Sequence, residues 1–163
     1  MDVPNNINSL LSTVQMEIIR LRQERTSCSQ ATFAGICRAA GCSRSDEELL
    51  ALSAGFRGGT GCSYNEGSCG ALMAGVMALG MFLPEDNAKA VTLSKELFEH
   101  FKERYGTVIC GNIVYRNGFA ACTGCCLCVG RKVIGLLCRE QVLTQKDTLN
   151  RITSKYKQET HQS

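Results

Sequence analysis

Residues 69–82 read CGALMAGVMALGMF and contain no charged side chain. A helix that is apolar on nearly every side is normally buried on nearly every side, so this stretch predicts the central helix of the fold. Its small residues would let neighbouring backbones come very near: Gly70, Ala71, Ala74, Gly75 and Ala78. We therefore expect a fold arranged around one buried helix.

A glycine-rich segment comes directly before this helix. Residues 55–68 read GFRGGTGCSYNEGS and hold five glycines. Glycine weakens helix interiors but permits tight turns and close backbone approaches, so we expect a loop here. The segment lacks the lysine of a phosphate-binding P-loop, which argues against a nucleotide site.

Further helices are expected on the N-terminal side. Apolar residues recur at helical spacing in residues 1–25, which predicts an amphipathic first helix. A second helix is expected over residues 27–41. In Ser45-Asp46-Glu47-Glu48, Ser45 would cap a short third helix that runs to Gly55, with Glu48 reaching back to complete a capping box.

The C-terminal half is also expected to be helical. Pro84-Glu85-Asp86 predicts the start of a helix that Gly106 would end. The apolar face of this helix is expected to contain Val91, Leu97, Phe98, Phe101 and Tyr105. Residues 107–114 fit a helix or a strand, and residues 125–152 have a helical pattern. The elements together predict an all-α, single-domain bundle of five or six helices spanning residues 1–163.

Charge and composition narrow the function classes. The net charge is +3, aromatic residues make up 6% of the chain and Trp is absent, so we expect no nucleic-acid binding. The apolar run over residues 71–83 is shorter than the roughly 20 residues of a membrane span, so we expect no membrane insertion. No secretory signal is apparent at the N-terminus, which favours a cytoplasmic location.

Cysteine is the most unusual component of the chain. There are eleven cysteines in 163 residues, and five of them fall between Cys122 and Cys138. In a reducing compartment, clustered thiols are more often metal ligands or catalytic groups than structural disulfides. The sequence therefore indicates metal binding or thiol redox chemistry.

Several cysteines coincide with the predicted ends of helices. Cys28 and Cys69 fall near helix starts, and Cys110 follows the turn after a helix stop. Cys125 is expected to open the last long helix, with Cys122 one CxxC step before it. Helix N-termini favour thiolates, and iron–sulfur clusters need several thiolates that converge from such positions.

The same segments resemble a family of redox-active proteins named for its CGAxxG motif and four cysteines (C_GCAxxG_C_C). The shared features are residues 27–31 (SCSQA), Gly55-Phe56 with Gly58-Gly59, Cys69-Gly70-Ala71, residues 101–106 (FKERYG) ahead of Cys110, and a last cysteine before Val129-Gly130. The resemblance extends over residues 21–137, and the ordered set is more specific than any one motif. One departure is that the motif glycine is displaced to Gly75.

The resemblance implies that the family cysteines are Cys28, Cys69, Cys110 and Cys125. Three neighbours could each take the place of Cys125: Cys122, Cys126 and Cys128. The family is similar to a domain of split-Soret cytochromes, which implies an iron–sulfur cluster as cofactor. No CxxCH is present, because Cys126 follows Cys122-Thr123-Gly124-Cys125, so we expect no covalent haem.

Three functions follow as alternatives. The first is an iron–sulfur protein of electron transfer or redox sensing, whose cysteine-rich redox domain spans residues 26–152, between the first helix and a frayed polar tail over residues 153–163. The second is a dithiol oxidoreductase that uses Cys122 and Cys125. The third is a non-redox module that binds zinc or a soft metal. A redox partner protein and a homodimer through residues 69–82 are further expectations.

The remaining cysteines and histidines are given modest roles. Cys37, Cys42 and Cys138 are expected to pack as small apolar or half-exposed residues. Cys62, in the glycine-rich loop, would be an extra ligand or a resolving thiol. His100 is expected to face solvent.

Overall fold

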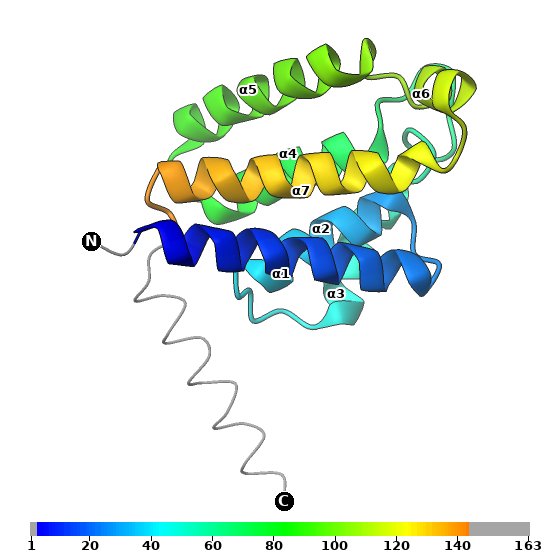
Figure 1. The fold of residues 1–163 in the computed structure, drawn as a ribbon. Helices are drawn as coiled ribbons and strands as arrows, with labels where there is room; N and C mark the ends of the chain where they lie inside the picture. Colours follow the sequence, from blue (N-terminus) through cyan, green and yellow to red (C-terminus); the bar gives the residue numbers. More distant parts are fainter. Residues whose placement is uncertain (1–2, 144–163) are drawn as a thin grey trace, which may run out of the picture.

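The computed structural model describes the backbone of residues 3–143 and the side chains of residues 7–143. Over this part of the chain the fold is all-α (Figure 1). Its elements are α1 (Val3–Gln23), α2 (Cys28–Ala39), α3 (Asp46–Ser53), a 3₁₀ turn η1 (Ala54–Phe56), α4 (Gly70–Phe82), α5 (Asn87–Tyr105), α6 (Cys110–Asn117) and α7 (Ala121–Arg139). The expected fold class is confirmed.

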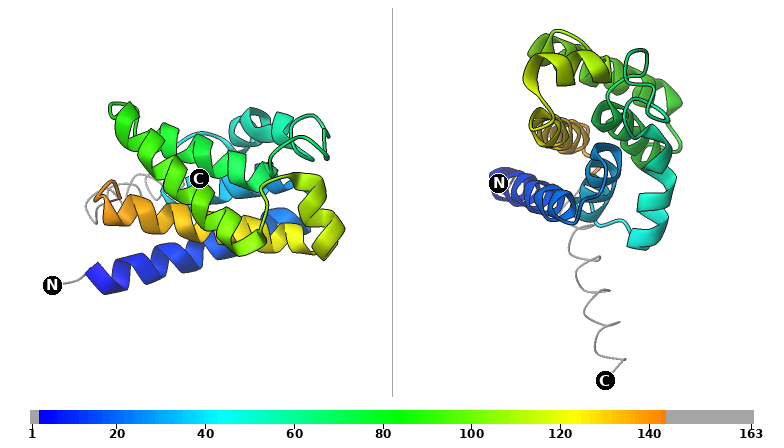
Figure 2. Two further views of the ribbon diagram at one scale, coloured as in Figure 1. Left: turned by 90° about the horizontal axis from the view of Figure 1, so that it is seen from above. Right: turned by 90° about the vertical axis from the view of Figure 1, so that its right-hand side faces the viewer.

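The core lies between α1, α2, α4 and α7. Helix α4 packs against α2, α5 and α7, while α1 packs against α2 and α7. The views of Figures 1 and 2 agree that α7 runs beside α1 and α4, with α5 on the outer side of α4 and α7. The expectation of a buried central helix is correct, because seven of the residues of α4 are buried.

Small residues allow the closest helix contacts, as the sequence predicts. A Cβ atom on Gly75 of α4 would lie 2.5 Å from Cγ1 of Val129 in α7. The fully buried Ile18 of α1 fits against two further glycines, Gly35 of α2 and Gly130 of α7, where an added Cβ would come within 2.6 and 2.5 Å of it. The displacement of the motif glycine to Gly75 therefore preserves a tight contact between α4 and α7.

Helix α7 is the one described helix that is long and apolar enough to cross a membrane. In the structure it packs against α1, α2, α4 and α5. Its apolar residues, such as Val129, Val133 and Leu137, are fully buried in the core that it shares with these helices. Its hydrophobicity is thus explained by its place in the bundle.

The predicted helix ends are largely observed. Ser45 and Glu48 form the expected capping box, and Ser27 forms a second one with Gln30 at the start of α2. Asp86 caps α5, and Gly106 ends it in the left-handed conformation, with φ of 69°. These local signals fix the positions of the elements that carry the cysteines.

Four expectations about the elements need correction. The described part of the chain has seven α-helices instead of five or six, because the ambiguous residues 107–114 lead into α6. The last helix begins at Ala121, so Cys125 lies one turn inside it. It ends at Arg139, and residues 144–163, including the expected tail, lie outside the described part.

Val91 of α5 is 71% exposed, although it is expected on the apolar face of the helix. The buried stripe of α5 is formed by Leu93, Leu97 and Phe101 instead.

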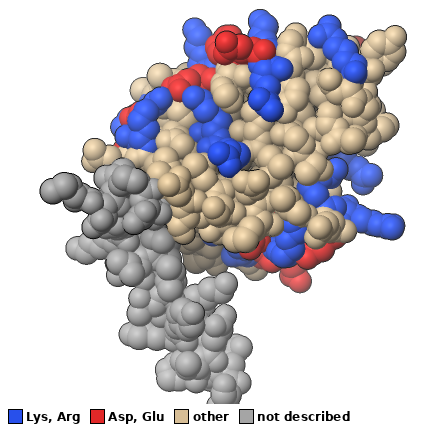
Figure 3. All heavy atoms as spheres, in the orientation of Figure 1, with Lys and Arg blue, Asp and Glu red and all other residues tan. Residues whose placement is uncertain are grey.

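Charged side chains are of mixed sign on the face drawn in Figure 3, where basic and acidic groups stand together along the upper edge. One ion-pair network joins α5 to α7. The carboxylate of Glu96 accepts hydrogen bonds from Nζ of Lys132 at 2.8 Å and from Nη2 of Arg139 at 2.9 Å. Hydrogen bonds from Arg139 and then Lys132 lower the pKa of Glu96 to about 2.

We expect Glu96→Gln to lower the free energy of unfolding by less than about 1 kcal/mol at pH 7, because the three side chains are partly exposed and solvent screens them. The pKa of Glu96 is lower in the folded than in the unfolded chain, so its contribution is present above about pH 4.5 and is lost as the pH falls towards about 2. Urea titrations of both proteins between pH 7 and pH 2 measure this difference. Glu85→Gln, at an exposed carboxylate without an ion pair to the described residues, should show no such trend.

Candidate thiol site

The N-termini of four helices meet at one end of the bundle. Cys28 is the first residue of α2, Cys69 immediately precedes α4, Cys110 is the first residue of α6, and Cys122 is the second residue of α7. In Figure 1 these four helix starts lie at the right-hand end, which faces the viewer in the right panel of Figure 2. The positive ends of these helix dipoles therefore lie near the thiols, where they favour the thiolate form.

The glycine-rich loop ties two of these cysteines together. The backbone N–H of Cys69 donates to the carbonyl of Val108 at 2.7 Å, and that of Cys110 donates to the carbonyl of Gly67 at 2.9 Å. Ser68 and Ile109 form an isolated antiparallel bridge between these bonds. The segments that precede α4 and α6 are thus held side by side.

Glycines give the loop its compact path. Gly59 has a left-handed φ of 77°, and a Cβ atom there would lie 3.0 Å from Cβ of Cys110. A Cβ on Gly70 would lie 3.1 Å from Sγ of Cys28. The sequence-based expectation of tight turns and close backbone approaches is confirmed at both ends of the loop.

The thiol of Cys69 is influenced most by Cys125. An interaction with the Cys125 side chain is the main reason why the pKa of Cys69 lies far above its usual value, and burial adds to the effect. The backbone N–H groups of Leu72 and Ala71, in the first turn of α4, act in the opposite direction by hydrogen bonding to the sulfur. This is the behaviour expected of a thiol at a helix N-terminus.

The other predicted cysteines interact with the same pair. Burial, followed by the charges of Cys69 and Cys28, raises the pKa of Cys110 to about 12. Burial also raises the pKa of Cys28, with Cys69 as the second cause. The pKa of Cys122 is raised by burial and then by Cys28 and Cys69. The structure thus brings all five predicted ligand residues to one end of the molecule.

A cation from α1 also reaches this site. Arg22 lowers the pKa values of Cys28 and Cys122, against the effect of burial. Its guanidinium is held by the carbonyl of Thr26, to which Nη1 donates at 2.6 Å, and by the hydroxyl of Thr123, to which Nε donates at 3.3 Å. Nothing in the spacing of residues 1–25 pointed to this role, since Arg22 reaches the site only through the packing of α1 on α7.

The remaining cysteines near the site make other contacts or lie exposed. Cys126 is fully buried, and its Sγ donates to the carbonyl of Cys28 at 3.5 Å. Sγ of Cys128 lies 3.7 Å from Nε2 of His100, so the expectation that His100 faces solvent is wrong. Cys62 is exposed in the loop, with a left-handed φ of 63°.

Tyr105 is a site residue that the sequence did not single out. The pKa of its hydroxyl is raised by burial and then by the charge of Cys125. Its ring packs on Phe101 with centroids 4.7 Å apart. The only sequence signal was its position at the end of α5, next to Gly106.

Soft thiolate donors at helix ends are the ligands that iron–sulfur clusters use, so the donor chemistry of this site fits such a group. Among residues 7–143, however, no three His, Cys, Asp or Glu side chains are grouped closely enough to hold a metal ion. The thiols therefore supply the right donors without forming a ready ligand cage.

Comparison with known proteins gives one family. A comparison with curated proteins and another with solved structures found no match. The profile of the family described as "Putative redox-active protein (C_GCAxxG_C_C)" matches residues 26–162, which is most of the chain. The match includes Cys28, Cys69, Cys110 and the whole Cys122–Cys128 cluster. The chain therefore belongs to the C_GCAxxG_C_C family of redox-active proteins.

Proposed function

We propose that this redox-active protein binds an iron–sulfur cluster at the end of the bundle where four helices begin. The ligands would be Cys28, Cys69, Cys110 and a thiol of α7, either Cys125 or Cys122. The supporting observation is the convergence of thiols from four separate helix N-termini. When bound, the cluster would supply one-electron chemistry for electron transfer or redox sensing.

The raised pKa values of the thiols favour metal binding over dithiol catalysis. An attacking thiol works as a thiolate, so catalytic cysteines usually have lowered pKa values. Burial raises the pKa values of Cys110 and Cys122 instead. A bound metal would supply the missing positive charge, and binding would release protons from these thiols.

Helix dipoles and backbone N–H groups would stabilise the bound iron–sulfur cluster. Thiolate-ligated clusters carry negative charge, which helix N-termini stabilise. The N–H groups of Ala71 and Leu72 already point at Cys69, and that of Ala71 also acts on Cys28. Hydrogen bonds from backbone N–H groups to ligand sulfurs are among the factors that set cluster potentials.

A partner protein would approach the same end of the molecule. Tyr115 in α6 is 92% exposed, and Phe119 between α6 and α7 is 69% exposed. Exposed aromatic side chains are enriched at protein interfaces. We propose this aromatic pair, next to Cys110 and Cys122 in the sequence, as part of the contact with the redox partner.

Anaerobic purification tests the cluster. The protein should be brown, with visible absorption and near-stoichiometric iron and sulfide. Cys69→Ser should lose the iron and the absorption, whereas Cys138→Ser should keep both. Cys138 is a suitable control because it lies near the far end of α7 and burial alone raises its pKa. Protein without iron or sulfide, after anaerobic reconstitution, would end the proposal.

The choice between the two α7 ligands can be tested in the same way. Cys125 is the largest influence on the pKa of Cys69, whereas Cys28 and Cys69 both act on the pKa of Cys122 after burial. We expect Cys125→Ser to lose more iron than Cys122→Ser. The reverse order would assign Cys122 as the ligand.

Two other functions remain as alternatives, and each predicts a different experimental result. The influence of Cys125 on the pKa of Cys69 favours these two residues as the pair if the protein is a dithiol oxidoreductase. A reversible Cys69–Cys125 or Cys122–Cys125 disulfide in metal-free protein would support that function. Zinc without sulfide, retained after anaerobic preparation from iron-rich medium, would support the zinc-binding module.

A further inference from the structure

A second pair of thiols lies away from the helix starts, where α2 ends. Cys37 is in the last turns of α2, and Cys42 follows Gly41 in the next segment. Cys37 is fully buried, whereas Cys42 is half-buried. Burial, and then the charge of Cys42, raises the pKa of the Cys37 thiol. Neither residue is among the cysteines that the family resemblance assigns.

The end of α2 places these two residues together by its backbone geometry. Gly41 is left-handed, with φ of 72°. Its N–H donates to the carbonyl of Arg38 at 3.0 Å, and the N–H of Cys42 donates to the carbonyl of Cys37 at 2.8 Å. These two bonds define a Schellman motif, in which the side chains at the positions of Cys37 and Cys42 normally meet.

The same hydrogen bond sets an upper limit on the backbone separation. With standard bond lengths, an N···O distance of 2.8 Å keeps the Cα atoms of Cys37 and Cys42 within about 6.7 Å of each other. Disulfides form across Cα distances of about 4.4 to 6.8 Å. The backbone separation is therefore within the range that a disulfide spans.

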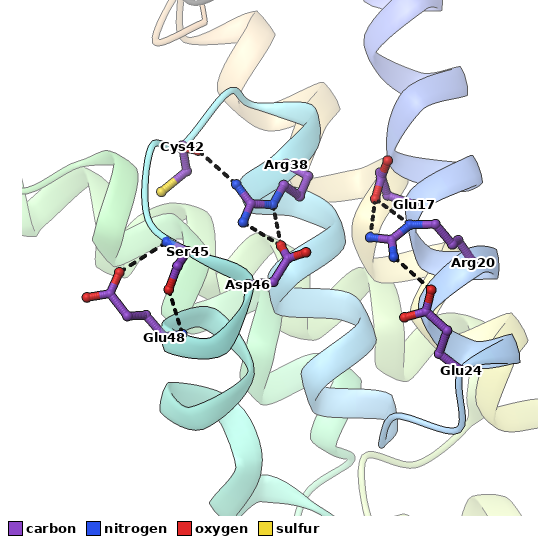
Figure 4. Close-up of polar contacts among 8 residues, drawn as sticks. All are labelled: Glu17, Arg20, Glu24, Arg38, Cys42, Ser45, Asp46 and Glu48. Atoms are coloured by element: carbon purple, nitrogen blue, oxygen red, sulfur yellow. Dashed lines mark hydrogen bonds and ion pairs between the residues drawn. The ribbon is translucent and has the colours of Figure 1, made fainter. Parts of the chain in front are cut away.

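The surroundings give the pair a stable reduced form and place two cations near it. The S–H of Cys37 donates to Sδ of Met81 in α4 at 3.7 Å, so the buried thiol has a partner when reduced. Arg38 and Arg44 both favour the thiolate of Cys37, against the larger effect of burial. Figure 4 shows Arg38 between Cys42, whose carbonyl accepts from Nη1 at 3.3 Å, and Asp46, which pairs with the same guanidinium.

We propose that Cys37 and Cys42 form a second redox-active dithiol, which reacts with low-molecular-weight disulfides such as oxidised glutathione. The half-buried Cys42 attacks one sulfur of the glutathione disulfide, forms a mixed disulfide and releases one glutathione. Cys37 then attacks Sγ of Cys42, forms the internal disulfide and releases the second glutathione. The two protons of the protein thiols end on the two glutathione molecules, and two electrons pass from the protein to the oxidant.

Peptide mapping of the full chain tests the proposal. The reduced, iron-free protein is treated with oxidised glutathione, alkylated and digested with trypsin, which cuts after Arg38 and Arg44. The expected product is a disulfide that joins the peptides 26–38 and 39–44. Because Cys28 lies on the first peptide, fragmentation spectra or the Cys28→Ser variant must assign the bond to Cys37.

Variants separate the two steps. Cys42→Ser should abolish the cross-link, and Cys37→Ala should instead accumulate a stable mixed disulfide of glutathione at Cys42. Cys138→Ser is the matched control, at another half-buried cysteine, and should leave the cross-link unchanged. A wild-type protein that remains reduced, or that stops at the mixed disulfide on Cys42, would overturn the proposal. The iron-free protein makes these outcomes independent of the cluster.

Discussion

Gly67→Ala should destabilise the protein by about 3 kcal/mol or more, at the upper end of the cost of overpacking. A Cβ atom at this position would lie 1.5 Å from the carbonyl oxygen of Gly59 and 2.3 Å from its carbon. Both atoms belong to the backbone, so no side chain can rotate to make room. The loop would have to move as a whole, and thermal or urea unfolding would measure the cost.

The same movement should disturb the thiol site. The carbonyl of Gly67 accepts the N–H of Cys110, and the neighbouring bond joins Cys69 to Val108. A displaced loop would lose these bonds and separate the starts of α4 and α6. We therefore expect Gly67→Ala to lose iron even under conditions in which the helices remain folded by circular dichroism.

Gly55→Ala provides the control within the same glycine-rich segment. No atom lies within 4 Å of a Cβ added there, so we expect a change of no more than about 0.5 kcal/mol, as for most surface substitutions. Equal stabilities of the two alanine variants would show that the contact between Gly59 and Gly67 does not hold the loop.

The fold could be predicted closely because its signals are local. The capping residues Ser45 and Glu48, the stop at Gly106 and the uncharged stretch over residues 69–82 each act within a few residues of chain. Val91 shows the limit of this approach. It is apolar and lies in a helix, but the packing of α5 on α4 buries Leu93 and Leu97 instead, and no local pattern specifies that rotation.

The candidate site could be predicted only as a set of residues. The position of each cysteine near a helix start followed from the sequence, but their partners did not. The influence of Cys125 on Cys69 depends on how α4 packs against α7, and the contact between Cys128 and His100 depends on how α5 packs against α7. Cys37 and Cys42 are an instructive exception, because Gly41 between them is a recognisable helix-end signal that would have placed them together.

Gly70→Ala should also destabilise the protein, although alanine is the better helix former. Its Cβ would lie 2.5 Å from the carbonyl oxygen of Phe56 and 3.2 Å from Cβ of the buried Ser29. The backbone at Phe56 and two side chains at the start of α2 therefore crowd this position. We expect a loss of about 1–3 kcal/mol, the usual cost of an extra carbon in a packed region.

Gly80→Ala lies in the same helix and should have the opposite sign. A Cβ atom at Gly80 meets nothing within 4 Å, so alanine should stabilise α4 by about 0.5–1 kcal/mol through its helix propensity. Both variants replace glycine by alanine in α4, but only Gly70→Ala creates a steric conflict. Urea unfolding of both proteins would show whether the conflict or the propensity decides stability.

The reactivity of the Cys28 thiol provides a second measurement on Gly70→Ala, besides its stability. The added Cβ at Gly70 would lie 3.1 Å from its Sγ, and burial is the main reason why the pKa of Cys28 is raised. Pushing the thiol towards solvent should lower that pKa, so alkylation of Cys28 near pH 7 should accelerate by roughly tenfold for each pKa unit that is lost, because the thiolate is the reactive form. The rate should stay at the wild-type value in Gly80→Ala. An unchanged rate in Gly70→Ala would mean that α2 and α4 can absorb the extra carbon without moving the thiol, and that Gly70 does not hold Cys28 in place.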